Sequence, residues 1–256
     1  MGEDRYTKIP SSGWKSLYRV GGAAALVAGI LFRRNLADEY FLLRSLGVFH
    51  SGPMAIPGNA LAWFTLLHEN PFLGLTLLNL FDVVNYTLVG LIFLGLYAAL
   101  RRVNKGSMTL ALAIGLVGVT VYLASNQAFA LLSLSDQYAA ATTDAQRSLF
   151  LAAGQALLAI QNSGATYGNG IYTSYLCVTL ACLLMATVML ESRVFSKVTA
   201  WCGILAAVFG LGYYITAAFA PQLNAIPIST SAPFLLIWYI LTGLRLLRLG
   251  AEAPKE

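Results

Sequence analysis

Six stretches of this chain are almost entirely apolar, and segments richer in polar and charged residues separate them. A helix needs about 20 mostly apolar residues to cross the hydrocarbon core of a bilayer. The pattern therefore predicts six transmembrane helices. They occupy Leu17–Phe32, Phe72–Leu100, Met108–Leu134, Ile171–Leu190, Val198–Ala220 and Ala232–Leu249.

The composition agrees with this pattern. Of the 256 residues, 58% are hydrophobic and 11% are charged, and the mean hydropathy is +0.70. Soluble domains are about 45–50% apolar and about 25% charged. The predicted fold is all-α: a polytopic membrane protein with a bundle of six transmembrane helices, short interfacial helices in the outer loops, and a single domain over residues 1–256.

The first apolar stretch resembles the core of a signal peptide, but it runs into Arg33 and Arg34 without an A-x-A cleavage site. We therefore expect an uncleaved first span. Its small residues Gly21, Ala25 and Gly29 recur at every fourth position. That spacing puts them on one face of a helix and favours close packing in lipid.

The distribution of basic residues predicts the orientation in the membrane. With a cytoplasmic N-terminus, the inner segments hold twelve Lys and Arg residues and the outer loops hold four. Cytoplasmic loops carry such an excess, and the bias is consistent only with an even number of spans. We expect a multi-pass protein of the cell membrane with both termini in the cytoplasm.

Two outer segments are too long to be simple turns. Residues 33–71 form a predicted outer cap loop, whose apolar clusters are too short to span and whose prolines interrupt helices. We expect short helices there that bury Phe41, Leu46, Trp63 and Leu67.

Residues 136–168 contain a predicted outer amphipathic helix. Leu149, Ala153, Leu157 and Ile160 have the spacing of one helical face. Asp144 is the expected N-cap of this helix.

The second apolar stretch carries an unexpected polar stripe. Asn79, Asp82, Asn85 and Tyr86 fall on one side of a continuous helix. Counted back from Arg101 at 1.5 Å per residue, Asp82 lies about 28 Å from the cytoplasmic edge. The hydrocarbon core is about 30 Å thick, so this level is near the outer boundary.

Other polar residues are expected at the same level, on the third and fifth spans. Together with the stripe they form a candidate outward-facing vestibule for a ligand. Its residues are Asn79, Asp82, Asn85, Tyr86, Asn126, Gln127 and Tyr213. A second interpretation stays open, in which these side chains only line the membrane interface, where tyrosine is enriched.

Catalytic and metal-binding motifs are weak. His50, His68 and Glu69 are acceptable metal ligands, with Asp38 or Glu39 as a fourth, but the chain has no H-x-x-x-H or H-E-x-x-H spacing. It also lacks Walker, Rossmann and G-x-S-x-G motifs. We predict no catalytic residues, no metal site and no cofactor.

Several stretches resemble an uncharacterised family of six-span prokaryotic membrane proteins, domain of unknown function 4386. They are "SLYRVGGAAALVAGILF", "LYAALRRVNKGSMTLALAIGLVG", "AAATTDAQRSLFLAAGQALLA", "RVFSKVTAWCGILAAVFGLGYYI" and "LIWYILTGLRL". The resemblance implies a compact six-helix bundle, and it brings no functional residues with it.

Three functions follow as hypotheses. The first is binding or transport of a small or amphiphilic ligand through the vestibule, and the second is a non-enzymatic accessory or structural subunit that docks a partner membrane protein. An enzyme that uses Asp82 with His50 or His68 as acid and base ranks behind both, because these groups must first come within hydrogen-bond reach. The expected partners are the lipid bilayer, a small-molecule or lipid ligand and a membrane protein, and no nucleic acid.

Overall fold

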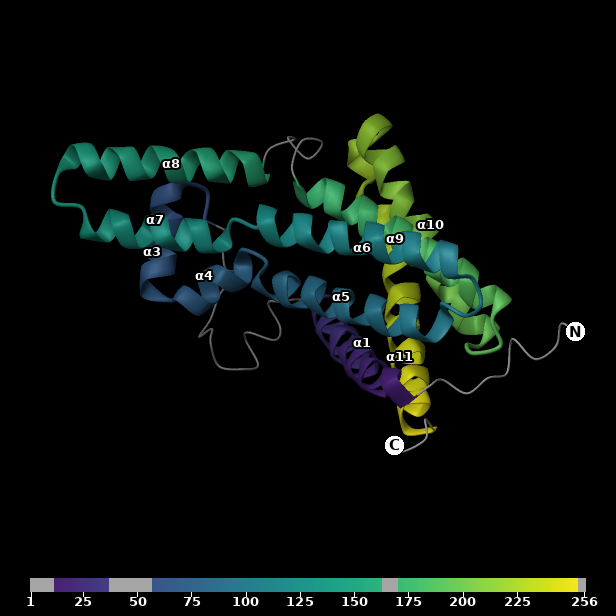
Figure 1. The fold of residues 1–256 in the computed structure, drawn as a ribbon. Helices are drawn as coiled ribbons and strands as arrows, with labels where there is room; N and C mark the ends of the chain where they lie inside the picture. The colour runs from purple at the N-terminus through teal and green to yellow at the C-terminus, as the bar shows by residue number, and fades with distance from the viewer. Residues whose placement is uncertain (1–11, 37–56, 163–169, 253–256) are drawn as a thin grey trace, which may run out of the picture. The chain divides into compact units, whose positions relative to one another are not determined.

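The computed structural model describes residues 12–36, 57–162 and 170–252, and every regular element in these ranges is a helix (Figure 1). The predicted all-α fold is therefore confirmed. In chain order the elements are η1 (Ser12–Trp14), α1 (Lys15–Leu36), α3 (Ala60–Glu69), α4 (Pro71–Leu77), α5 (Leu80–Leu100), α6 (Lys105–Ser125), α7 (Ala128–Ala140), α8 (Asp144–Asn162), α9 (Gly170–Glu191), α10 (Lys197–Phe219), η3 (Pro221–Leu223) and α11 (Ala225–Glu252).

Six helical segments of the described chain are long and apolar enough to cross a membrane, as predicted. The protein is thus a multi-pass membrane protein. The segments are Lys15–Phe32, Leu80–Leu100, Lys105–Ala140, Gly170–Glu191, Lys197–Phe219 and Pro221–Glu252.

The second predicted span is interrupted near its start, so the prediction of one helix over Phe72–Leu100 is wrong. Helix α4 ends and α5 begins around Asn79, whose φ of 66° is left-handed. The backbone N–H of Asn79 donates to the carbonyl of Thr76, as at many helix C-termini. Asparagine adopts this conformation more readily than most residues, which explains a break where hydropathy is continuous.

The third predicted span, Met108–Leu134, is also two helices. The side-chain Oδ1 of Asn126 accepts a hydrogen bond from the backbone N–H of Ala128 at 3.0 Å. It thereby satisfies a backbone donor that a new helix leaves without a partner. Helix α6 has 21 residues and is about 32 Å long at 1.5 Å per residue, so it can cross the hydrocarbon core without α7.

Asparagine side chains also begin three other helices. Asn59 accepts from the backbone N–H of Ala62 at the start of α3, and Asn70 accepts from that of Leu73 at the start of α4. At the start of α6, Asn104 accepts from the N–H of Ser107. Each bond satisfies one of the donors that every helix N-terminus exposes.

Contacts divide the chain into two compact units. Unit 1 comprises Met1–Ala37, Asn85–Thr120 and Ser174–Glu256, and unit 2 comprises Asp38–Val84 and Val121–Thr173. Helices α5, α6 and α9 contribute residues to both. That residues 1–256 act as a single domain stays a prediction.

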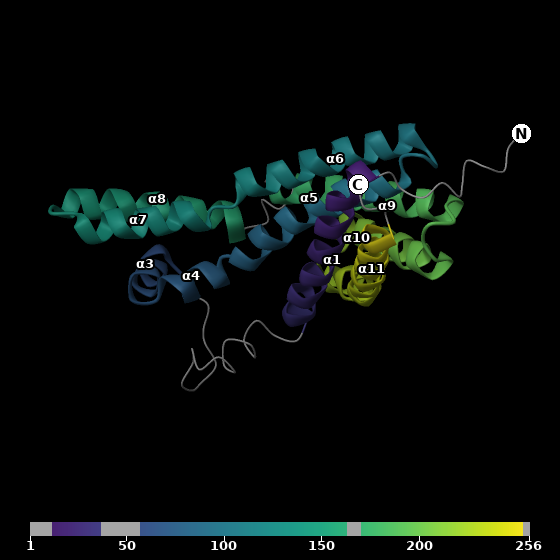
Figure 2. The same cartoon turned by 60° about the horizontal axis from the view of Figure 1, so that its bottom comes forward.

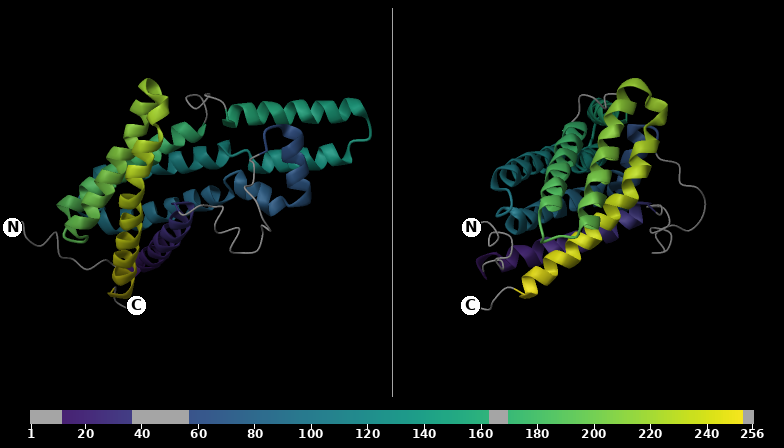
Figure 3. Two further views of the ribbon diagram at one scale, coloured as in Figure 1. Left: turned by 180° about the vertical axis from the view of Figure 1, so that it is seen from behind. Right: turned by 90° about the vertical axis from the view of Figure 1, so that its right-hand side faces the viewer.

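Unit 1 has a core of aromatic and aliphatic side chains from α1, α5, α6, α9, α10 and α11. Tyr18, Phe93 and Trp238 are among its largest members, each no more than 2% exposed. The hydroxyl of Tyr18 donates to the carbonyl of Ala98 at 3.3 Å. Helix α1 thus packs against α5 as well as against α11, beside which it lies in Figure 3.

Glycines set the spacing of α1 from its two neighbours. A Cβ placed on Gly21 would lie 2.9 Å from the Cα of Gly95 in α5. A Cβ placed on Gly22 would lie 2.9 Å from the backbone nitrogen of Leu247 and 3.0 Å from the carbonyl oxygen of Gly243, both in α11. Main chains therefore meet directly on both sides of α1, and no side chain separates them.

The predicted small-residue face of α1 is part of this packing. Gly21, Ala25 and Gly29 are all buried. Small residues at such interfaces allow the close approach on which helix association in lipid depends.

Unit 2 is built around a helical hairpin of α7 and α8, which lie side by side in Figures 1 and 2. Helix α3 packs against both with Trp63, Phe64 and Leu67. Trp63 and Leu67 are 3% and 0% exposed, which confirms their predicted burial, whereas Phe41 and Leu46 lie outside the described residues. The hydroxyl of Ser135 donates to the carbonyl of Phe64 at 3.0 Å and ties α7 to α3.

The predicted N-cap of the amphipathic helix is wrong. Thr143 is the N-cap of α8, since its Oγ1 accepts from the backbone N–H of Gln146, and Asp144 is the first helical residue. Leu149 is 65% exposed, whereas Leu158 is buried. The buried face includes Gly154, because its missing side chain leaves room for the ring of Phe64.

Candidate functional site

Three tyrosines of unit 1 form a compact cluster between α9 and α10. Tyr175 stacks on Tyr214 at an interplanar angle of 17°, and their ring centroids are 5.9 Å apart. Tyr213 meets both rings edge to face, with centroids 5.9 Å from Tyr175 and 5.6 Å from Tyr214. We call these three residues the tyrosine cluster.

The local sequence positions the cluster. Tyr213 and Tyr214 are adjacent on α10, and Gly210 lies one turn earlier on the same helix. A Cβ at Gly210 would be 2.8 Å from the hydroxyl oxygen of Tyr175. A larger residue there would push Tyr175 away. The glycine therefore allows the phenol of Tyr175 to contact the backbone of α10.

Hydroxyl groups surround Tyr175. Its hydroxyl lies within hydrogen-bonding reach of Thr179, one turn further along α9, and of Ser231 on α11. Both partners are buried, and the hydroxyl of Ser231 donates to the carbonyl of Ile228 at 2.9 Å. A buried polar side chain is costly unless it is hydrogen-bonded, and this arrangement meets that requirement.

The beginning of α11 lies at the same end of unit 1. A Cβ on Gly212 of α10 would be 3.4 Å from Cβ of Pro227, which is buried in the first turn of α11. Three residues earlier, the side-chain oxygen of Asn224 is buried without a hydrogen-bond partner among the described residues. This end of the unit therefore combines aromatic faces, hydroxyl groups and an amide oxygen.

Of the seven residues predicted to line a vestibule, Tyr213 belongs to this cluster. Asn85 and Tyr86 are also in unit 1, half-buried on α5. Asn79, Asp82, Asn126 and Gln127 are in unit 2. The vestibule as a whole stays a prediction.

The polar stripe is shorter than predicted. Asn85 and Tyr86 lie three and four residues after Asp82 in α5, so both neighbour it on the same face. Asn79 is not part of this helix; its carbonyl accepts from the backbone N–H of Asp82 at 3.1 Å and begins it.

Asp82 has a clear structural role at this position. It lies in the first turn of α5 and is half-buried. The partial positive charge of a helix N-terminus stabilises a carboxylate there. The helix break thus gives this carboxylate a favourable helix N-terminus, which offsets part of the cost of its partial burial.

Asn126 and Gln127 connect α6 to α7. Asn126 forms the capping bond described above, whereas the side-chain oxygen of Gln127 is buried without a partner among the described residues. A buried acceptor without a donor is uncommon in proteins. Gln127 therefore remains a candidate contact for a ligand.

The weak metal-ligand candidates do not form a group in the described part of the chain. His68 and Glu69 end α3 and are exposed. No three His, Cys, Asp or Glu side chains with metal-binding geometry occur among the described residues. His50, Asp38 and Glu39 lie outside them.

Tyr175, Thr179 and Ser231 were not among the site residues predicted from the sequence. Tyr175 and Thr179 are four residues apart, so they share a helical face. That spacing could have marked them as a pair, but the sequence alone does not say that α10 and α11 supply the other members.

Neutralising Asp82 should remove its favourable interaction with the N-terminus of α5. Asp82→Asn should lower the free energy of unfolding in detergent by about 0.3–1 kcal/mol, because a carboxylate in the first helical turn contributes that much. Asp136→Asn is the matched control, since Asp136 is exposed in the second half of α7. Denaturant titration followed by circular dichroism measures both, and a silent Asp82→Asn would contradict the role.

The sequence matches one protein family over most of its length. The family described as "Domain of unknown function (DUF4386)" matches residues 40–250 of the 256. No curated protein and no solved structure matches the chain significantly. The matched region includes the tyrosine cluster, α3 to α10 and nearly all of α11. The chain belongs to the DUF4386 family of membrane proteins.

Proposed function

We propose that this protein binds a small amphiphilic ligand at the tyrosine cluster of unit 1. The observation that carries the proposal is the contact of three tyrosine rings beside Gly210, with the hydroxyls of Thr179 and Ser231 within reach of Tyr175. Binding sites are mostly apolar with a few convergent polar groups. The cluster has this composition.

The chemistry of the cluster defines the class of ligand. Tyrosine rings offer large apolar faces, and their hydroxyls donate and accept hydrogen bonds. A matching ligand has a hydrogen-bonding head and an apolar body. Because the ring centroids are only 5.6–5.9 Å apart, the rings leave no space between them for a cation, and the ligand lies against their outer faces.

The polar residues predicted to line a vestibule are a separate proposal that rests on the sequence pattern. They are candidate contacts for the same class of ligand, which would enter from outside the cell membrane: Asn79, Asp82, Asn85, Tyr86, Asn126 and Gln127. We propose transport of the same ligand across the membrane as an extension of this binding function.

Loss of single hydroxyls tests the site. Native mass spectrometry of the protein purified from its membranes in mild detergent should show a bound amphiphile on the wild type. Tyr213→Phe and Tyr214→Phe should reduce its occupancy several-fold, since removing a hydroxyl that binds ligand costs about 0.5–1.5 kcal/mol. Tyr138→Phe, on α7 of unit 2, is the matched control. A wild type without an amphiphile, or equal occupancy in all variants, would contradict the proposal.

A second candidate function is docking of a partner membrane protein by unit 2. Its helices have a hydrophobic core of their own, yet Leu61, Phe129 and Leu149 remain exposed. Exposed apolar groups of this kind can mark interaction sites. An absent amphiphile together with a stable co-purifying protein would favour this function over ligand binding.

The proposed orientation has both termini in the cytoplasm. Single cysteines, introduced into a variant without native cysteines, should react with an impermeant maleimide from outside at Thr143 and Gln222. At Gly106 and Ser196 they should react only after permeabilisation. All four residues are exposed, so the accessibility of each reports on its side of the membrane, and the reverse pattern would refute the orientation.

A further inference from the structure

The basic residues of unit 1 gather at one end, as contacts between helices show. Arg101 follows α5, and its guanidinium carbon lies 3.9 Å from the ring centroid of Trp14, just before α1. A Cβ on Gly250 of α11 would lie 2.7 Å from Cγ of Arg19 in α1. The first turns of α1 therefore meet both the end of α5 and the end of α11.

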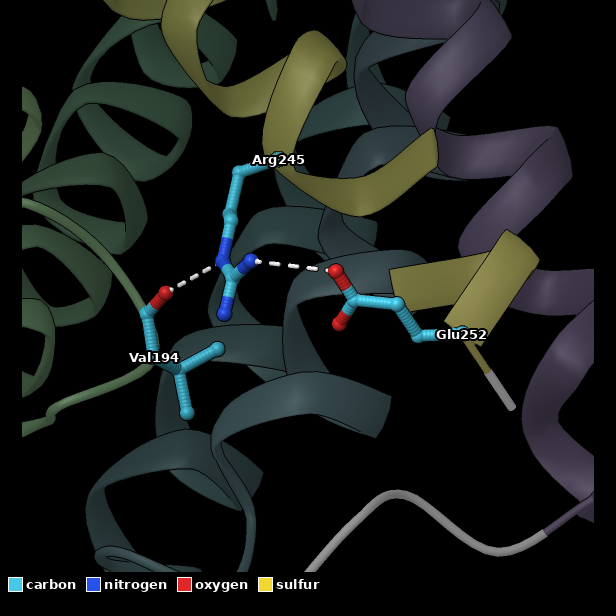
Figure 4. A network of polar contacts seen from close by, with 3 residues as sticks. All are labelled: Val194, Arg245 and Glu252. Carbon is cyan, nitrogen blue, oxygen red and sulfur yellow. Dashed lines mark hydrogen bonds and ion pairs between the residues drawn. The ribbon is translucent and has the colours of Figure 1, made fainter. Parts of the chain in front are cut away.

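Arg245 connects the turn between α9 and α10 to this group (Figure 4). Its Nε donates to the carbonyl of Val194 at 2.6 Å. One of its terminal nitrogens lies 3.9 Å from a carboxylate oxygen of Glu252. Residues 14–19, 101–105, 191–197 and 245–252 thus belong to one surface, which we call the basic end.

The charge of the basic end is strongly unbalanced. It contains nine Lys and Arg residues but only two Glu residues, and Glu252 already faces Arg245. The exposed cations include Arg19, Arg102, Lys105, Arg193 and Arg248. The basic end therefore carries a net positive charge that can attract anions.

Apolar side chains directly below these cations are also exposed. Val20 adjoins Arg19, Leu244 lies one turn before Arg248, and Trp201 lies one turn after Lys197. Val20, Leu244 and Trp201 are 45%, 42% and 53% exposed. Cations next to exposed apolar groups at the ends of spans match the structure of a lipid, with its charged head and its acyl chains.

Arg101 provides the most specific contact. Its Nε is buried without a hydrogen-bond partner among the described residues, and its guanidinium lies over Trp14. The ring contacts the face of the guanidinium, so the donors left for an anion are its terminal nitrogens and not the buried Nε. Arginine donors fit phosphate oxygens in a two-bond geometry. Trp14 also contacts Tyr97, and both types of residue are enriched at the headgroup level.

We propose that the basic end binds the phosphate headgroup of an anionic phospholipid, with Arg101 as the main contact and the exposed cations around it. The acyl chains lie along the exposed apolar residues of α1, α10 and α11. This site is separate from the tyrosine cluster and does not depend on ligand binding there.

The test compares lipids with matched acyl chains. The full-length protein in neutral detergent is titrated with phosphatidylglycerol, with phosphatidylcholine and with inorganic phosphate, and native mass spectrometry and melting temperature report binding. Phosphatidylglycerol should bind at least about fivefold more tightly than phosphatidylcholine and raise the melting temperature, since each cation near a headgroup contributes about that factor. Inorganic phosphate should have little effect, because it lacks acyl chains.

Two sets of variants locate the site. Arg101→Gln should abolish the preference for phosphatidylglycerol, and so should the combined Arg19→Gln, Arg102→Gln and Arg248→Gln variant, whose three side chains are exposed and leave the core intact. Arg147→Gln is the control, because Arg147 is exposed on α8 of unit 2. Equal binding of both lipids, the same effect with inorganic phosphate, or an unchanged preference in the combined variant would overturn the proposal.

Discussion

The direct approach of α1 to α5 and α11 is the contact on which unit 1 depends. The hydrophobic effect that drives soluble helices together is absent between helices in lipid, so close van der Waals packing must take its place. Gly21 with Gly95, and Gly22 with Gly243, bring main chains into contact on two sides of one helix. With α1 held there, Tyr18 reaches Ala98 and Trp14 reaches Arg101.

A glycine also allows a close helix contact at the candidate site. Gly210 admits Tyr175 against α10, and the tyrosine cluster forms around that contact. The two ends of unit 1 nevertheless differ in chemistry. One presents phenols, buried hydroxyls and an amide, and the other presents guanidinium and ammonium groups beside tryptophan. Packing of small residues within the spans thus leaves the ends available for polar chemistry.

Hydropathy and small-residue spacing predicted the spans and the packing face of α1, because both depend on properties of single helices. The breaks at Asn79 and Asn126 were not predicted, since hydropathy is continuous across them. Asparagine itself was the available signal, because it caps helices and tolerates a positive φ. Asp82 is an example. In the sequence it is a charge inside an apolar stretch, and the helix break at Asn79 puts it in the first turn of α5.

Contacts between helices explain the remaining differences between the sequence predictions and the structure. The buried face of α8 includes Gly154, which apolar periodicity ignores, because the ring of Phe64 occupies the space that a side chain would take. Tyr175 could not be joined to Tyr213 from sequence, because residues 38 positions apart meet only through the packing of α9 on α10. Periodicity identifies the face of a helix, but not the neighbour it meets.

A double-mutant cycle at Gly21 and Gly95 tests the central claim most directly. The free energy of unfolding is measured in mixed micelles for the wild type, Gly21→Ala, Gly95→Ala and the double variant. Gly106→Ala is the control, because a Cβ there would meet only Oδ1 of Asn104, at an ordinary contact distance of 3.8 Å. Each single change should cost about 1–3 kcal/mol through overpacking. Because both methyl groups enter the same crossing, the double variant should cost less than the sum by about 0.5 kcal/mol or more. Additive losses, or losses no larger than that of Gly106→Ala, would contradict the account.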